Sequence, residues 1–158
     1  MGNSHQVEWD EKATTAANAR LELSPLVTQY FARIRKLLAK DPSPPELHRL
    51  RLATKRLRYT LELFRPCYGP GLETRMAELR ELQQFLGDVN DSTATGRMLA
   101  KAMPKSPQRT RVQTFLEERA AHKAREFRKH WNEVFDAPGR ERWWTLYLER
   151  QARTPSPK

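Results

Sequence analysis

Residues 44–66 read PPELHRLRLATKRLRYTLELFRP, and this stretch decides the fold. Prolines at its two ends predict a helix that begins at Pro44 or Pro45 and stops at Arg65, because proline fits the first helical turn but not the interior. Within that helix, one arc of about 100° collects the side chains suited to a protein core. They are Leu47, Leu50, Thr54, Leu57, Leu61 and Phe64. The stretch therefore predicts an amphipathic helix packed on one side against other helices.

The same helical periodicity continues on both sides of this segment. Upstream, Ser24-Pro25 predicts the N-cap and first residue of a helix that runs to about Lys40, with a short helix over residues 11–23 before it. Downstream, a helix is expected from Leu72, kinked at Gly87 and Gly96 and ended by Pro104. We expect the apolar stripe of this helix to consist of Met76, Leu79, Leu82, Leu86 and Val89.

A second long helix is predicted to open at Ser106-Pro107 and to close at Ala137-Pro138-Gly139, before a short helix at 141–150. Its inward-facing residues should be Val112, Phe115, Leu116, Phe127, Trp131, Val134 and Phe135. No alternating apolar and polar stretch indicates a strand. The predicted fold is all-α, an antiparallel four-helix bundle with short extra terminal helices. It divides into a mobile leader (1–10), a single helical domain (11–150) and a disordered tail (151–158).

The overall composition favours an anionic partner. The chain has 158 residues with 29 Lys+Arg against 19 Asp+Glu, a formal net charge of +10 and a pI near 10.2. Such an excess attracts phosphate chains, nucleic acid or acidic lipid. The single cysteine, Cys67, excludes an internal disulfide framework and a thiolate zinc site. With no apolar stretch of about 18 residues, we expect a cytoplasmic protein without a membrane span.

The basic residues of the 44–66 helix are ordered rather than scattered. His48, Arg51, Lys55 and Arg58 share an arc of about 80° beside the apolar stripe, at steps of three and four residues; we call this set the cationic ridge. No acid occurs between Leu47 and Leu61. Because like charges at these spacings repel one another, a bound anion explains the pattern better than helix stability does. A second apolar line (Leu52, Tyr59, Leu63) lies beyond the ridge and predicts a groove; Arg49 and Arg56 lie farther round.

Two motifs in this region resemble the CHAD family of conserved-histidine α-helical domains. They are LHRLRLATKRLRYTLELF (47–64), which fits H-x-x-R-x-x-x-[KR]-x-[LR]-R, and LQQFLGDVND (82–91), which contains L-G-x-x-x-D. The resemblance implies binding of inorganic polyphosphate in a basic channel, without catalysis by the domain. It places the family's histidine at His48, its basic positions at Arg51, Lys55, Arg56 and Arg58, and its acidic position at Asp91. Association with polyphosphate granules is a further expectation.

The resemblance also raises the question of oligomeric state. A full CHAD domain resembles two similar four-helix halves related by a pseudo-twofold axis, whereas this chain has one copy of the motif. We therefore expect that two chains form a homodimer that completes the channel, with the second apolar line as a candidate contact.

Other residues are candidates for the same polyphosphate-binding site. Further polyphosphate contacts are predicted from Arg33, Lys36, Tyr59 and Lys123. Asp91 would either orient a ridge arginine through a charge-assisted hydrogen bond or cap a kinked helix near Gly87. The roles of Gln83 and Asn90, close to the apolar stripe, stay open.

The main alternative is a helical module that binds nucleic-acid backbone, because a charge of +10 attracts DNA or RNA without special design. Only Tyr59 on the basic helix could stack on a base, so we expect nucleic acid to bind only non-specifically. An enzyme is not expected, since neither a phosphate-cradling glycine loop nor a zinc-binding H-E-x-x-H motif occurs. We predict no metal site, no cofactor and no membrane attachment, because the apolar face of the helix is needed for the core.

Overall fold

A computed structural model describes residues 8–155, and in this range the fold is an all-α helical bundle, as predicted. Five α-helices occur in the described range, together with the 3-10 turn η1 and the π-helical turn η2. Their bounds are α1 Thr15–Leu38, α2 Pro44–Leu63, η1 Arg65–Cys67, α3 Pro70–Ala102, α4 Pro107–His130, η2 Trp131–Phe135 and α5 Arg140–Arg150. None of these helices combines the length and apolar character that a transmembrane segment requires.

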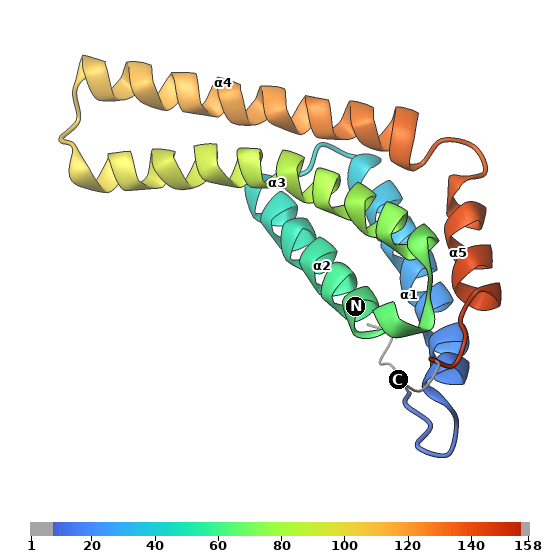
Figure 1. Cartoon of the computed structure of the whole chain (residues 1–158). Helices are drawn as coiled ribbons and strands as arrows, with labels where there is room; N and C mark the ends of the chain where they lie inside the picture. Colours follow the sequence, from blue (N-terminus) through green and yellow to red (C-terminus); the bar gives the residue numbers. More distant parts are fainter. Residues whose placement is uncertain (1–7, 156–158) are drawn as a thin grey trace.

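The helices form a packed body from which a two-helix arm projects (Figure 1). In the body, α2 packs against the first half of α3, and α1 packs against α2 and α5. The end of α3 and the start of α4 continue past α2 as an antiparallel pair, which we call the arm (residues 93–116). No residue between Thr93 and Glu126 is buried. The core therefore lies entirely at the other end of the molecule.

Aromatic rings form the centre of that core, where α1, η2 and α5 meet. Phe31 lies 5.3 Å from the rings of both Trp131 and Phe135, measured between centroids. Trp144 of α5 lies 5.6 Å from Phe135. All four side chains are at most 1% exposed. Large buried aromatic surfaces of this kind dominate the hydrophobic contribution to stability in a small domain.

The predicted helix start at Ser24-Pro25 is wrong, because α1 runs through Pro25 without a break. The N-cap is Thr14, whose hydroxyl accepts a hydrogen bond from the Ala17 N–H at 3.1 Å. Proline removes one backbone donor, which would bond to the carbonyl of Leu21, but Leu21 is 68% exposed and water can reach that carbonyl. Ser24 is buried and donates instead to Glu149 of α5 at 2.7 Å.

The predicted inward face of the long helix, which the structure divides into α4 and η2, is only half right. Phe127, Trp131 and Phe135 are buried, but Val112 is 42%, Phe115 60% and Val134 48% exposed; Leu116 is half-buried. Val112 and Phe115 belong to the arm, where α3 is the only described helix beside α4. Periodicity predicted an apolar face, but it could not show that α3 is the only described helix that packs beside its first half. The α3 helix continues through both Gly87 and Gly96.

The ends of the described chain remain in contact with the body. Trp9 lies 6.1 Å from the ring of Phe64, and the Arg153 N–H donates to the Cys67 carbonyl at 2.8 Å. Ala152 is buried. The rest of the predicted leader and tail, residues 1–7 and 156–158, lies outside the described residues.

Candidate polyanion-binding site

The basic helix α2 is fixed in register at its start and at its middle. Ser43 and Glu46 form a capping box, in which the Ser43 hydroxyl accepts from the Glu46 N–H at 3.3 Å and the Glu46 carboxylate accepts from the Ser43 N–H at 3.2 Å. At mid-helix, the Thr54 hydroxyl lies 2.7 Å from the Tyr30 hydroxyl of α1. All six predicted core residues of the helix are buried. The cationic ridge is therefore held on one flank of α2.

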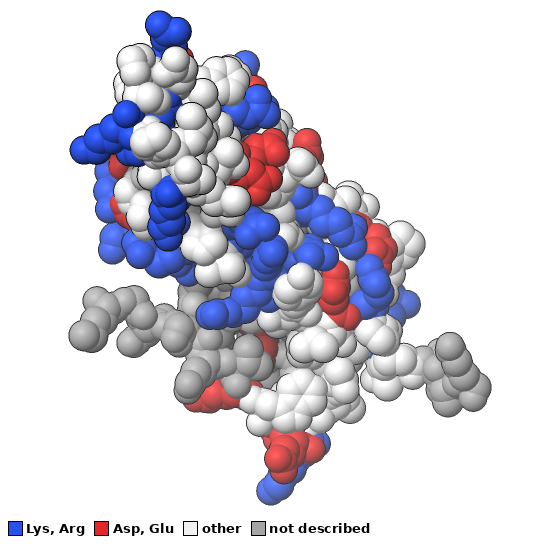
Figure 2. Space-filling view, turned by 90° about the vertical axis from the view of Figure 1, so that its left-hand side faces the viewer, with Lys and Arg blue, Asp and Glu red and all other residues white. Residues whose placement is uncertain are grey.

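A hollow of about 280 Å³ lies between this flank and the neighbouring helix α3. Three arginines and two aspartates contribute to its lining, together with two glutamines and a glycine. The residues are Arg51, Arg58, Arg80, Gln83, Gln84, Gly87, Asp88 and Asp91. Figure 2 views the molecule from the end where the arm projects, and Lys and Arg side chains gather across the middle of this face, with some acidic side chains between them. The hollow thus has a mixed lining with one more cation than anion, on a face where basic side chains predominate.

Two ridge residues at the centre of this flank have no anionic partner in the part of the chain that the structure describes. Arg51 and Lys55 are half-buried, and neither forms a hydrogen bond or ion pair with any described residue. Gly87 of α3 lies beside Arg51, since a Cβ atom at position 87 would lie 3.9 Å from the Arg51 Nε. A half-buried cation without a partner has lost hydration and gained nothing in return, which is unfavourable by itself. A bound anion would offset that cost.

The other two ridge residues are held by neutral amides of α3. Arg58 Nε donates to Gln83 Oε1 at 2.6 Å, and His48 Nδ1 lies 2.8 Å from Asn90 Oδ1. An amide oxygen orients a cation without neutralising it, unlike a carboxylate. Arg58 also pairs with Glu62 at 2.9 Å, and its guanidinium lies 4.7 Å from the centroid of the Tyr59 ring. Within the described residues, Arg58 is the one ridge cation with a carboxylate partner.

The remaining predicted site residues are placed around this centre. Arg49 and Arg56 are exposed on α2, and Arg33 and Lys36 are exposed on α1; none of them lines the hollow. Lys123 of α4 forms an ion pair with Glu126 at 3.2 Å.

Asp91 lines the hollow but makes no hydrogen bond or ion pair with a ridge residue among those described. The structure therefore brings Asp91 into the neighbourhood of Arg51 and Arg58, while its predicted orienting role stays a prediction.

Sequence reasoning placed Asp91 of α3 at the site but gave no role there to Arg80, Gln84 or Gly87. Arg80, Gln84, Gly87 and Asp91 follow one another at steps of four, three and four residues, which places them on one stripe beside the apolar stripe of α3. Arg80 is exposed and has no partner among the described residues. The periodic signal was present, but nothing in the sequence indicated that this stripe faces the basic helix.

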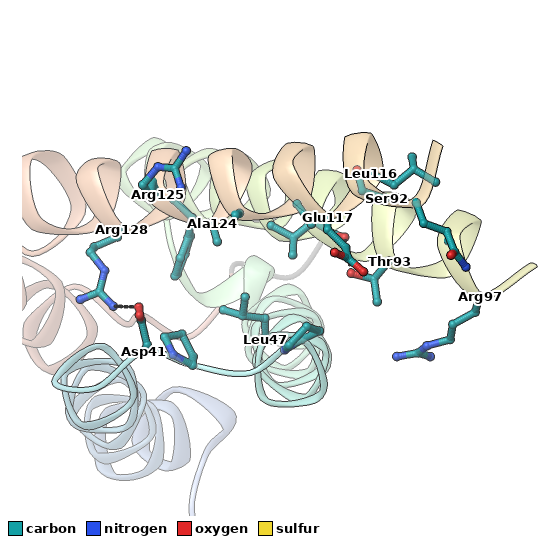
Figure 3. A pocket seen from close by; sticks show the side chains of 18 of the residues that line it. Asp41, Leu47, Ser92, Thr93, Arg97, Leu116, Glu117, Ala124, Arg125 and Arg128 are labelled. Carbon is teal, nitrogen blue, oxygen red and sulfur yellow. Dashed lines mark hydrogen bonds and ion pairs between the residues drawn. The ribbon is translucent and has the colours of Figure 1, made fainter. Parts of the chain in front are cut away.

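A larger cavity of about 750 Å³ lies beneath the arm and is a different kind of site (Figure 3). Its lining is mainly apolar or small, with Leu47, Leu116 and Ala124 among the residues drawn. Arg128 of α4 lies at its edge and belongs to the fold, since it donates to the Leu38 and Lys40 carbonyls at the end of α1, at 2.5 and 3.0 Å. Arg97 and Arg125 also line this cavity, but none of its lining residues belongs to the cationic ridge.

The fold and the site together define a class of helical domain in which one basic helix presents unpaired cations beside a polar stripe of its neighbour. The family model of the CHAD domain matches residues 5–100, which include α1, α2 and nearly all of α3, so the chain belongs to the CHAD family. The helices α4 and α5 lie beyond the matched range. No curated protein and no solved structure matches the chain.

Proposed function

We propose that this protein binds inorganic polyphosphate, without catalysis, along the cationic ridge of α2 and the polar stripe of α3. One observation carries the proposal. Arg51, which lines the hollow, and Lys55, one helical turn further along α2, are half-buried and have no carboxylate partner among the described residues. Membership of the CHAD family supports polyphosphate as the anion.

The chemistry of the ligand suits this arrangement. Polyphosphate repeats the same negative charge along a flexible chain, so a row of cations can accept it in any register. The guanidinium groups of Arg51 and Arg58 can each donate to two phosphate oxygens, whereas Lys55 supplies a compact charge. Binding would release counterions from the polyanion, so we expect the affinity to fall steeply with added salt. His48, Arg49 and Arg56 would contribute further charge on the same helix.

Nucleic acid is the alternative ligand, and the structure offers little to recognise a base. The Tyr59 ring is 51% exposed, but it already lies against the Arg58 guanidinium. We therefore expect nucleic acid to bind through its backbone alone, and more weakly than polyphosphate.

A homodimer would extend the ridge into a longer channel. The second apolar line of α2 is exposed, at 46% for Leu52 and 77% for Leu63. Covering this line with a second copy would remove apolar surface from water and bring two ridges together. Light scattering with and without polyphosphate tests this part, since a monomer under both conditions would contradict it. We further propose that the protein is cytoplasmic and associates with polyphosphate granules.

The proposed function is tested by titrating the protein with long-chain polyphosphate in a calorimeter and repeating the titration with excess DNA or RNA. At equal phosphate concentration, we expect nucleic acid to displace little of the bound polyphosphate. Complete displacement would favour the nucleic-acid function. Incubation with Mg²⁺ or Mn²⁺ should release no phosphate, and measurable release would contradict the non-catalytic role.

A further inference from the structure

The arm carries half of the net charge of the protein in less than a sixth of its length. Residues 93–116 include five Lys and Arg and no Asp or Glu, which gives +5 of the total of +10. The rest of the chain has 24 Lys and Arg against 19 acids. A surface that only keeps a protein soluble mixes charges of both signs. The excess of cations in the arm therefore points to an anionic ligand. The five cations are Arg97, Lys101, Lys105, Arg109 and Arg111.

Two of these cations, Arg97 and Lys101, continue the row of α3 residues that faces the cationic ridge. Gln83 and Asn90, seven residues apart in this row, both contact ridge residues of α2. Seven residues make nearly two helical turns, so the next member of the row is Arg97, and Lys101 follows one turn later. In Figure 3 the Arg97 side chain leaves α3 on the side where α2 lies, and Arg97 lines the same cavity as Leu47 of α2.

Both cations lie past the point where α2 begins. Pro44, the first residue of α2, precedes His48 by four residues, about 6 Å along the helix axis. Arg97 lies seven residues beyond Asn90, the partner of His48, which is about 10 Å along the antiparallel helix α3. Arg97 and Lys101 are exposed, and neither forms a hydrogen bond or ion pair with any described residue. They are therefore open to a ligand that runs along α2 and past its start.

We propose that Arg97 and Lys101 extend the polyphosphate site from the cationic ridge onto the arm, so that a long chain lies in the hollow and continues along α3. The inference rests on the proposed function. Arg97 and Lys101 are four residues apart on one helix and repel each other. A phosphate chain across both would offset this repulsion and accept paired hydrogen bonds from the Arg97 guanidinium. The other cations of the arm would add to the positive potential that attracts the chain.

This extension makes the affinity depend on the length of the polyphosphate chain. Arg97 and Lys101 lie ten and fourteen residues beyond Gly87, the α3 residue beside Arg51 in the hollow. These separations correspond to about 15 and 21 Å along α3. Tripolyphosphate seated in the hollow is too short to reach Lys101, whereas a long chain can contact the hollow and the arm together. The two chain lengths therefore distinguish the arm from the ridge.

The test compares Arg97→Ala with Lys101→Ala, as one double variant, against the wild type by calorimetric titration at several salt concentrations. Long-chain affinity should fall by about tenfold, the effect of losing two solvent-exposed charge contacts. The slope of log affinity against log salt should become shallower by roughly one to two, because fewer counterions are released. Tripolyphosphate affinity should change by less than about twofold, since salt screens charges at this distance. Unchanged long-chain affinity would overturn the inference, and so would an equal loss with tripolyphosphate.

Arg111→Ala with Arg119→Ala is the matched control. It removes the same charge from exposed positions of α4 that do not line the cavity beneath the arm. Long-chain affinity should change by less than about twofold, because neither residue belongs to the row on α3. A loss as large as that of the first double variant would show that total charge determines binding and would contradict the inference. A wild type that binds neither chain would overturn the proposed function itself.

Discussion

The arginines at the two ends of this molecule are used in different ways. Around α5, several arginines are bound by the fold, since Arg35 pairs with Asp136 at 2.6 Å and Arg140 pairs with Glu78. Beside α2 and α3, Arg51 and Arg80 have no partner among the described residues. The net charge of +10 does not distinguish the two groups. The difference teaches that the candidate ligand site is marked by where the unpaired cations lie, beside the hollow between α2 and α3, and not by total charge.

Arg75 shows the structural use most clearly. It is 4% exposed, and its guanidinium lies 3.5 Å from the centroid of the Trp143 ring and 3.9 Å from that of Tyr147. Its two terminal nitrogens donate to the Gly71 and Trp143 carbonyls at 2.8 and 2.7 Å. Burial lowers the pKa of Arg75 to about 10, so the group stays charged at neutral pH. This arginine joins α3 to α5, and it has little exposed surface with which to contact a ligand.

The largest expected effect comes from removing that structural arginine. Arg75→Ala should lower the free energy of unfolding by about 2–4 kcal/mol, because it leaves a cavity between two rings and two carbonyls without a donor. Urea denaturation followed by circular dichroism measures this. Arg80→Ala, five residues along the same helix, should change stability by less than about 0.5 kcal/mol. An equal loss of unfolding free energy in the two variants would contradict the distinction between arginines that stabilise the fold and arginines that are free for a ligand.

Gly87→Glu should lower polyphosphate affinity by about tenfold, because it places a carboxylate next to Arg51 and supplies the partner that this cation lacks. The position has space for a side chain, since a Cβ atom there would come no closer to a neighbouring helix than 3.9 Å, at the Arg51 Nε. Binding is measured by calorimetric titration. Undiminished affinity in a folded Gly87→Glu protein would show that the ligand does not use Arg51.

Gly87→Ala tests the effect of position 87 on protein stability without placing a charge near the ligand. Because alanine is favoured over glycine inside a helix and nothing obstructs its Cβ, this change should stabilise the protein by about 0.5–1 kcal/mol. The denaturation midpoint reports it. Destabilisation would indicate that α3 approaches α2 more closely at this point than the structure shows.

The smallest effect is expected from Glu62→Gln. This change removes the one carboxylate that pairs with a ridge cation among the described residues and leaves Arg58 held by Gln83. Affinity for polyphosphate should rise by roughly two- to threefold, as one repulsive charge is lost near a polyanion. Weaker binding would mean that Glu62 orients Arg58 for the ligand instead of competing for it.

The sequence predicted the basic helix well because its signals are local. The two prolines define its start, and the spacing from Leu47 to Phe64 defines its buried side, so the position of the cationic ridge followed directly. The same local reasoning failed at Pro25, where packing of a long helix against α5 outweighs one missing hydrogen bond.

The partners of the ridge could not be predicted, because they depend on the register between two helices. Gln83 and Asn90 are seven residues apart on α3, and they contact Arg58 and His48 only because α2 packs antiparallel to α3 at one particular offset. Likewise, Phe115 has the spacing of a core residue, but its exposure follows from the absence of any described helix over the arm. Periodicity in the sequence identifies the apolar and polar faces of each helix. Which face contacts which is known only once the helices are placed in three dimensions.

The most direct test reverses the charge of the two unpaired ridge cations and measures long-chain polyphosphate binding by calorimetry. Arg51→Glu with Lys55→Glu should reduce affinity by at least about a hundredfold at low salt, since two attractive contacts become repulsive. The control, Arg142→Glu with Arg150→Glu, makes the same charge change at exposed positions of α5 and should bind nearly as the wild type does. Equal affinity of the two double variants would contradict the assignment of the site to α2.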